Sequence, residues 1–312
     1  MRMKEETFQR YIEDPGRLRL ISRVNLMRLS QELVEIVMSM LADTEEFRIR
    51  EIRLNWSNSL SSALQRALVK IEDVNLRSRF LDFRPAVESL EALCVEIVKC
   101  EKLKMKKLKL RIRTYDSKDT DCPSASPEAL SGAVVRLEQV EFGFIMNQQQ
   151  IMAIADRIRT EKELKLRSLQ LPMRCEVDSI PPQLLAEALI RLERIPQNLN
   201  FSEQQIFYLL RSVQESREGE LRLKTLVLFR RDLSSCGNVL SEAIVKLETV
   251  ILTDSRLSRK QRKVLLKKIA RAENLKTKFL ELGNINLSNV PVNDLLKGFS
   301  RVRLGKLSEI IY

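Results

Sequence analysis

The sequence predicts an α/β fold built from repeats, in which short strands alternate with helices. Four segments of the form apolar-Glu-x-apolar begin 66, 55 and 55 residues after one another, at Ile71, Leu137, Leu192 and Leu247. A second set of apolar-x-apolar segments falls between them, and such alternation is the period of a strand. Recurrence at this spacing indicates a chain assembled from similar units that stack on their neighbours.

Eleven segments carry the strand pattern. They lie at residues 24–26, near residues 54, 76, 110, 142, 171, 195, 228, 252 and 282, and at residues 302–304. The segment near residue 195 contains Pro196, which has no N–H to donate to a strand ladder. We therefore expect this strand to be short or bulged.

Helical periodicity fills the intervals between the strands, and the predicted helices alternate in length. The short ones span residues 63–71, 127–137, 182–192 and 238–247, and the long ones span residues 86–103, 147–164, 202–217 and 258–275. Their starts carry capping residues: Ser126 precedes Pro127, and Ser202 precedes Glu203. Ser before Pro or an acidic residue is typical of a helix N-terminus.

Residues 1–20 do not fit the repeat, so we predict an N-terminal cap or extension, with a helix at residues 5–14 that ends at Pro15 and Gly16. Residues 21–312 form the predicted repeat array. Within it, the polar, turn-rich residues 115–126 predict an exposed loop. The final apolar residues either cover the end of the array or lead into a longer protein.

The residues around one strand fit a known repeat consensus. Leu223, Leu226 and Leu228 match the pattern LxxLxL, with Leu233 five positions on, and residues 275–287 match it more loosely. With its alternating helix lengths, the chain from residue 21 to 312 resembles leucine-rich repeat proteins of the ribonuclease-inhibitor-like subclass. The resemblance implies a horseshoe-shaped α/β solenoid, with parallel strands on the concave face and helices on the convex face.

One feature of that family is mostly missing. The family usually has Asn or Cys three residues after the last strand leucine, where it bonds to the backbone of the neighbouring loop. This chain has instead Ser57, Arg174, Arg231, Ser255 or Ile285. Because unpaired buried amides cost about 1–3 kcal/mol each, we expect Ser, Thr and Asp in these loops to satisfy them locally.

Composition excludes most kinds of catalytic site. The chain has no His, which rules out Ser-His-Asp triads, Cys-His pairs and His-ligated zinc. Its 5 Cys form no CxxC motif, and no phosphate-binding glycine motif occurs. We therefore predict a protein that is not an enzyme and has no cofactor and no metal site.

The sequence gives no sign of membrane insertion. The first ten residues carry charges where a signal peptide would be apolar, and no run of about 18 uncharged apolar residues occurs. Scattered single cysteines are typical of a reducing compartment. We expect a soluble cytoplasmic protein, with the nucleus as an alternative because residues 259–263 resemble a nuclear-import patch.

The formal net charge of +12 indicates an acidic partner, a nucleic acid or a membrane surface, or simply a lysine-rich solvated surface. Basic residues concentrate in residues 99–113 and 258–276. In the first cluster, strand alternation places Lys107, Lys109 and Arg111 on the face opposite the leucines. In the second, helical spacing leaves the basic residues outside. A solvated face is the alternative for both.

The predicted concave face changes along the chain from basic and amide-rich to apolar. An apolar patch next to charge is typical of a protein-binding surface, although single exposed apolar residues are the alternative. The predicted partner-binding residues are Arg53, Asn55, Asn75, Arg77, Lys107, Lys109, Arg111, Val227, Phe229 and Ile251.

These observations favour a leucine-rich repeat interaction module that binds an acidic protein partner on its concave face. Two alternatives remain open. A basic solenoid could bind nucleic acid, although the basic strands lack the interleaved aromatic residues that stack on bases. The chain could also be the repeat portion of a larger intracellular sensor-type receptor. Neither the identity of the partner nor the oligomeric state follows from the sequence.

Overall fold

The structure, a computed structural model, describes residues 22–27, 29–43, 49–56, 60–80, 84–114, 125–172, 175, 177–195, 199–217, 219–282, 297 and 300–304. The chain divides into two compact units, Met1–Cys175 and Glu176–Tyr312, and each is described by itself. The predicted cap at residues 1–20 and most of the predicted loop at residues 115–126 lie outside the described residues.

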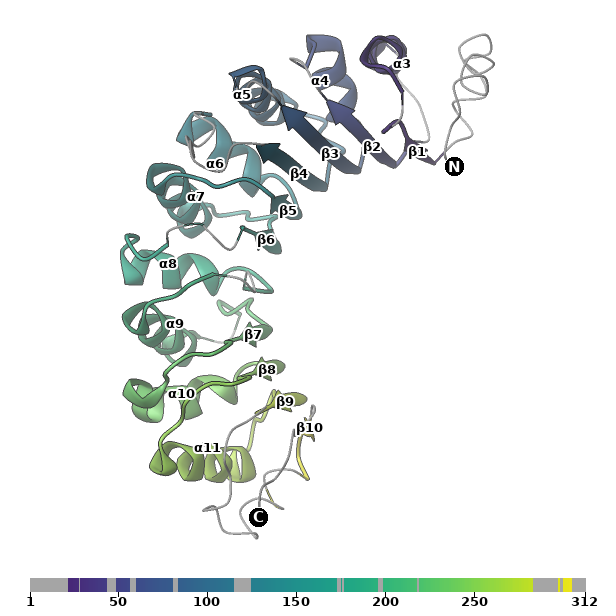
Figure 1. The fold of residues 1–312 in the computed structure, drawn as a ribbon. Coiled ribbons are helices and arrows are strands. Elements are labelled where there is room, and N and C mark those ends of the chain that lie inside the picture. The colour runs from purple at the N-terminus through teal and green to yellow at the C-terminus, as the bar shows by residue number, and fades with distance from the viewer. Residues whose placement is uncertain are drawn as a thin grey trace. The chain divides into compact units, whose positions relative to one another are not determined.

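The first unit is a six-stranded parallel sheet in the order β1-β2-β3-β4-β5-β6, with helices between successive strands and along one side of the sheet (Figure 1). In chain order its elements are β1 (Arg23–Asn25), α3 (Gln31–Asp43), β2 (Glu51–Trp56), α4 (Ser62–Leu68), β3 (Asp73–Phe80), α5 (Arg84–Lys99), β4 (Lys107–Thr114), α6 (Pro127–Val135), β5 (Gln139–Phe142), α7 (Gln148–Thr160) and β6 (Ser168–Gln170).

The second unit repeats this arrangement around a four-stranded parallel sheet in the order β10-β9-β8-β7. Its elements are α8 (Pro182–Leu189), α9 (Glu203–Glu215), β7 (Thr225–Val227), the 3-10 turn η1 (Ser234–Cys236), α10 (Gly237–Ile244), β8 (Thr249–Ile251), α11 (Arg259–Arg271), β9 (Phe279–Glu281) and β10 (Arg303–Leu304).

The prediction of an α/β repeat arrangement with parallel strands and helices of alternating length is confirmed. The predicted helices run two to four residues too far at their C-terminal ends. For example, α4 ends at Leu68 and α6 at Val135. The predicted ranges include residues such as Ile71 and Leu137. These residues are buried, but they lie in the turn before the next strand and are not helical.

The helices predicted from the sequence do not include α3. Its buried residues are Val34, Val37, Met38, Leu41 and Ala42, which recur at intervals of three and one. That spacing marks one face of a helix packed on the core.

The strand expected near residue 195 is reduced to a single bridge between Arg194 and Thr225. This agrees with the expectation that Pro196 limits pairing there.

The core lies between the sheet and the helices, because every second strand residue points toward the helices. In the first unit Val24, Ile52, Val74, Leu108, Val140 and Leu169 occupy one register row, and all are buried. In the second unit Leu226, Val250 and Leu280 form the corresponding row. Leu228 and Leu282 are also buried, as the strand pattern predicted.

Three long helices begin with the same buried glutamine. Gln150, Gln205 and Gln261 are the third residues of α7, α9 and α11, and each completes a capping box with Asn or Ser at the N-cap. The amide oxygen accepts a hydrogen bond from the N-cap N–H at 2.8–3.1 Å. The amide nitrogen donates to a carbonyl ahead of the preceding short helix. The three acceptors are the carbonyls of Ala125 (2.9 Å), Val177 (2.6 Å) and Leu233 (2.6 Å).

A second kind of hydrogen bond recurs at the C-terminal ends of the long helices. Basic residues that follow the short helices α4, α6 and α10, and likewise Arg301, donate to carbonyls at the C-terminal end of an earlier long helix, where backbone acceptors are unpaired and the helix dipole is negative. The pairs are Lys70 with Ala42, Arg136 with Ile97 and Cys100, Lys246 with Ser216, and Arg301 with Ile269 and Ala270. Part of the positive charge of the chain therefore stabilises the fold.

The loop after β8 shows how the missing Asn or Cys is replaced at one position. The Ser255 hydroxyl donates to the carbonyl of Leu228 at 3.3 Å and accepts from the N–H of Arg231 at 3.4 Å. Ser255 therefore bonds to the backbone of the loop after β7, 24 and 27 residues away, and not locally within its own loop as expected. Arg230 and Asp254 occupy equivalent positions after β7 and β8, and both have positive φ, at 54° and 55°.

We expect Leu228→Ala to lower the free energy of unfolding by about 2–5 kcal/mol, because the buried side chain leaves a cavity. Thr225→Ala, at a half-buried position on the other face of β7, should cost much less. Urea unfolding of both variants measures the difference. Equal losses at the two positions would contradict the strand orientation.

We expect Gln205→Glu to lower the free energy of unfolding by about 1–3 kcal/mol, because a carboxylate cannot donate to the carbonyls of Val177 and Ile180. The matched control is Gln204→Glu, which makes the same change at an exposed position of the same helical turn. It should leave stability unchanged or slightly raised, since negative charge favours a helix N-terminus. Chemical denaturation midpoints of the two variants test this; similar stabilities would show that the buried amide has no special role.

Candidate functional site

The strands of the first unit present a polar face on the side away from the helices, here called the open face. Register pairing arranges its side chains in three rows across the sheet. These rows are Arg23-Glu51-Asp73-Lys107-Gln139-Ser168, Asn25-Arg53-Asn75-Lys109-Glu141-Gln170 and Asn55-Arg77-Arg111. The seven candidate residues that the sequence placed in this part of the chain therefore lie together on the adjacent strands β2, β3 and β4. Their role in binding stays a prediction.

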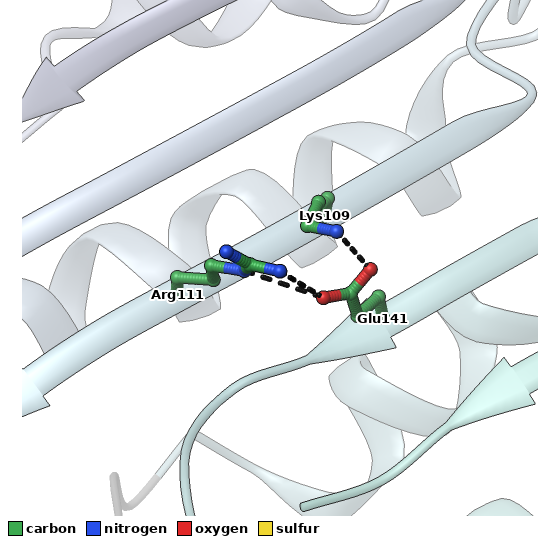
Figure 2. Close-up of polar contacts among 3 residues, drawn as sticks. All are labelled: Lys109, Arg111 and Glu141. Carbon is green, nitrogen blue, oxygen red and sulfur yellow. Dashed lines mark hydrogen bonds and ion pairs between the residues drawn. The ribbon is translucent and has the colours of Figure 1, made fainter. Parts of the chain in front are cut away.

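One carboxylate on the open face is shared by two of the candidate cations (Figure 2). The Lys109 Nζ and the Arg111 guanidinium both donate to Glu141, and the Arg111 Nη2 lies 3.0 Å from Oε1. Partial burial alone would raise the pKa of the Glu141 carboxyl, but the hydrogen bonds from Lys109 and Arg111 outweigh it and hold the pKa below its ordinary value. Glu141 thus neutralises part of the predicted basic patch.

At the N-terminal edge of the open face, Arg53 and Asn55 are engaged by neighbours within the sheet. Arg53 pairs with Glu51 at 2.7 Å, and Arg23 also pairs with Glu51 at 3.1 Å. The Asn55 side-chain amide donates to the carbonyl of Met27 at 2.7 Å. The Arg23 and Asn55 contacts join the β1 segment to β2, whereas the Arg53 pair lies within β2.

In the middle of the open face, fewer of the basic side chains are paired with acidic ones. Within the described part of the chain, Arg77 and Lys107 form no ion pair, and the Arg77 Nε and the Asn75 Oδ1 are buried without a hydrogen-bond partner. Burial raises the pKa of Asp73, which lies beside Lys107 in the register; Glu51 adds to the rise, whereas Lys107 opposes it. Arg77 and Lys107 are therefore the cations in the middle of the open face that no ion pair with a described residue neutralises, although Asp73 lies beside Lys107.

The apolar candidates lie in the second unit. Val227 and Ile251 are register neighbours on β7 and β8, and both are half-buried. Phe229 has 48% of its surface exposed, and the Arg230 guanidinium lies 5.1 Å from the centre of its ring. Sequence reasoning missed Phe279, which lies beside Thr249 on the same face. The alternation of Phe279 with the buried Leu280 could have revealed it.

The described residues offer no constellation for metal or thiol chemistry. Among them, no group of three or more His, Cys, Asp or Glu side chains is placed to hold a metal ion. Burial raises the pKa of the Cys94 thiol to about 12 and also raises that of Cys236, so neither thiol is activated as a nucleophile. No helix in the described ranges is both long and apolar enough to cross a membrane.

No protein-family model matches this chain, and no curated protein sequence matches it.

We expect Glu141→Gln to lower the free energy of unfolding at pH 7 by about 0.5–1 kcal/mol, since the three side chains of this ion-pair cluster are only partly buried. A carboxyl with a lowered pKa stabilises the fold above its unfolded-state pKa, and this contribution is lost as the pH falls through the folded-state pKa. The stability difference from the unaltered protein should therefore be largest above pH 4.5, the ordinary glutamate value, and vanish in stronger acid.

Urea unfolding at several pH values measures this difference, with Glu163→Gln as the control at an exposed carboxyl of the same unit. A difference that does not change with pH would show that the ion pairs contribute nothing.

Proposed function

We propose that this chain is a non-enzymatic interaction module of the leucine-rich repeat type, and that its open face binds an acidic segment of a protein partner. The repeat assignment is supported by the LxxLxL pattern, the parallel strands with alternating helices, and the Ser255 contacts in the loop after β8. The free cysteines of the described residues support a reducing compartment, the cytoplasm or the nucleus, as its place of action.

The observation that carries this proposal is the uneven charge on the open face. The three rows hold Arg23, Arg53, Arg77, Lys107, Lys109 and Arg111 against the acids Glu51, Asp73 and Glu141. Crowded like charges are unfavourable unless water, salt or an acidic ligand compensates them. Arg77 and Lys107 are the cations that a carboxylate from outside could pair with at least cost.

Glu141 supports a carboxylate as the recognised group, because Lys109 and Arg111 already hold one in this geometry. Residues that alternate along a strand are about 6.8 Å apart, and neighbouring strands are about 4.8 Å apart. An extended segment with acidic residues at alternate positions has the same repeat as Lys107, Lys109 and Arg111 along β4. Such a segment could also displace Glu141 and take over its two cations.

The direct test uses a fluorescein-labelled peptide of alternating Glu and Ser and measures its binding by fluorescence anisotropy. We expect Arg77→Gln combined with Lys107→Gln to weaken binding by about tenfold, since charge-assisted pairs are the stronger hydrogen bonds. The control, Lys165→Gln combined with Arg167→Gln, removes the same charge from exposed residues before β6. Glu141→Gln should tighten binding, because it releases Lys109 and Arg111.

The triple change of Lys107, Lys109 and Arg111 to Ser should abolish peptide capture without a large fall in melting temperature. Equal weakening in the double variant and its control would reject the open face as the binding site. Tighter binding of a labelled single-stranded oligonucleotide, with a steep fall in affinity as salt rises, would favour the nucleic-acid alternative instead.

A further inference from the structure

The second unit contains a basic hollow of about 870 Å³ on its helical side, between the end of α9, α10 and α11. This size falls within the range of about 300–1,000 Å³ that is typical of small-molecule sites. Six cations line it, several of them from the second basic cluster of the sequence: Arg217, Lys246, Lys267, Lys268, Arg271 and Lys276. Glu242 and Glu273 are the acids of the same lining, so the hollow has a clear excess of positive charge.

Lys246 and Lys268 have structural partners among the described residues, and Lys276 is also engaged. Lys246 donates to carbonyls at the end of α9, and Lys268 pairs with Glu242 at 2.7 Å. The carbonyls of Ile269 and Ala270 near the end of α11 are served by Arg301, which does not line the hollow. The carbonyls at the ends of α9 and α11 therefore have basic partners other than Arg217, Lys267 and Arg271.

Arg217, Lys267 and Arg271 make no ion pair within the described part of the chain. Lys267 and Arg271 are four residues apart on α11, so their side chains lie on the same helical face. A guanidinium and an ammonium that converge on one concave site bind phosphate oxygens well, because the fork of Arg donates two parallel hydrogen bonds. A concave wall also concentrates the field of the cations.

We propose that this hollow binds a small soluble molecule with several phosphate groups. The charge of the lining exceeds what a single carboxylate or phosphate would neutralise, and the volume suits a small molecule. This site is separate from the open face and does not depend on the proposed function.

The experiment titrates the whole protein with inorganic tripolyphosphate in an isothermal calorimeter. We expect saturable binding, and we expect Lys267→Gln combined with Arg271→Gln to weaken it by about tenfold or more. The matched control is Lys260→Gln combined with Lys263→Gln, which removes the same charge from exposed positions of the same helix outside the hollow. That variant should change the affinity by less than about twofold.

Glu242→Gln provides a test in the opposite direction, because it releases Lys268 and should tighten tripolyphosphate binding. This variant keeps the proposal testable even if the double variant folds poorly. Undetectable binding at millimolar tripolyphosphate, or equal weakening in the double variant and its control, would overturn the proposal. A lower melting temperature of the double variant without any binding by the unaltered protein would assign these cations to stabilising α11 instead.

Discussion

The fold depends on one buried side chain that satisfies two neighbouring elements together. A long helix begins with unpaired N–H groups, and the loop ahead of the preceding short helix presents inward carbonyls that water does not reach. Gln150, Gln205 and Gln261 satisfy both needs, because a carboxamide accepts at one atom and donates at the other. Glutamate, the other residue common at this capping position, supplies only the accepting half.

The positive charge of the chain is divided between structure and surface. Lys70, Arg136, Lys246 and Arg301 donate hydrogen bonds to helix carbonyls, so part of their charge is used within the fold. The net charge of +12 is therefore a poor measure of how strongly the protein attracts acidic molecules. What matters is where cations without a carboxylate or carbonyl partner lie close together, and the described residues place such cations in the middle of the open face and in the basic hollow.

Sequence alternation was enough to place the strands and to sort their side chains between core and open face. It could not show which cations are already paired, because side-chain conformations decide whether Glu141 reaches Lys109, Arg111 or neither. The glutamine contacts were equally hidden, since their partners lie about 25–28 residues away and polar residues at helix starts are common. The hollow is lined by residues of α10, of α11 and of the end of α9. Its shape depends on how these helices pack, which the spacing of apolar residues in the sequence does not show.

The glutamine contacts extend over one repeat only, and this limits how far strain passes along the chain. Each contact joins a helix only to the preceding unit of the repeat, as do the contacts of the basic residues at the helix ends. In a fold held by nearest-neighbour contacts, strain introduced in one repeat acts directly only on the repeats beside it. Because these contacts are local, adding or removing a complete pair of repeats, about 55 residues, should preserve the glutamine contact at the new junction where both neighbours carry it.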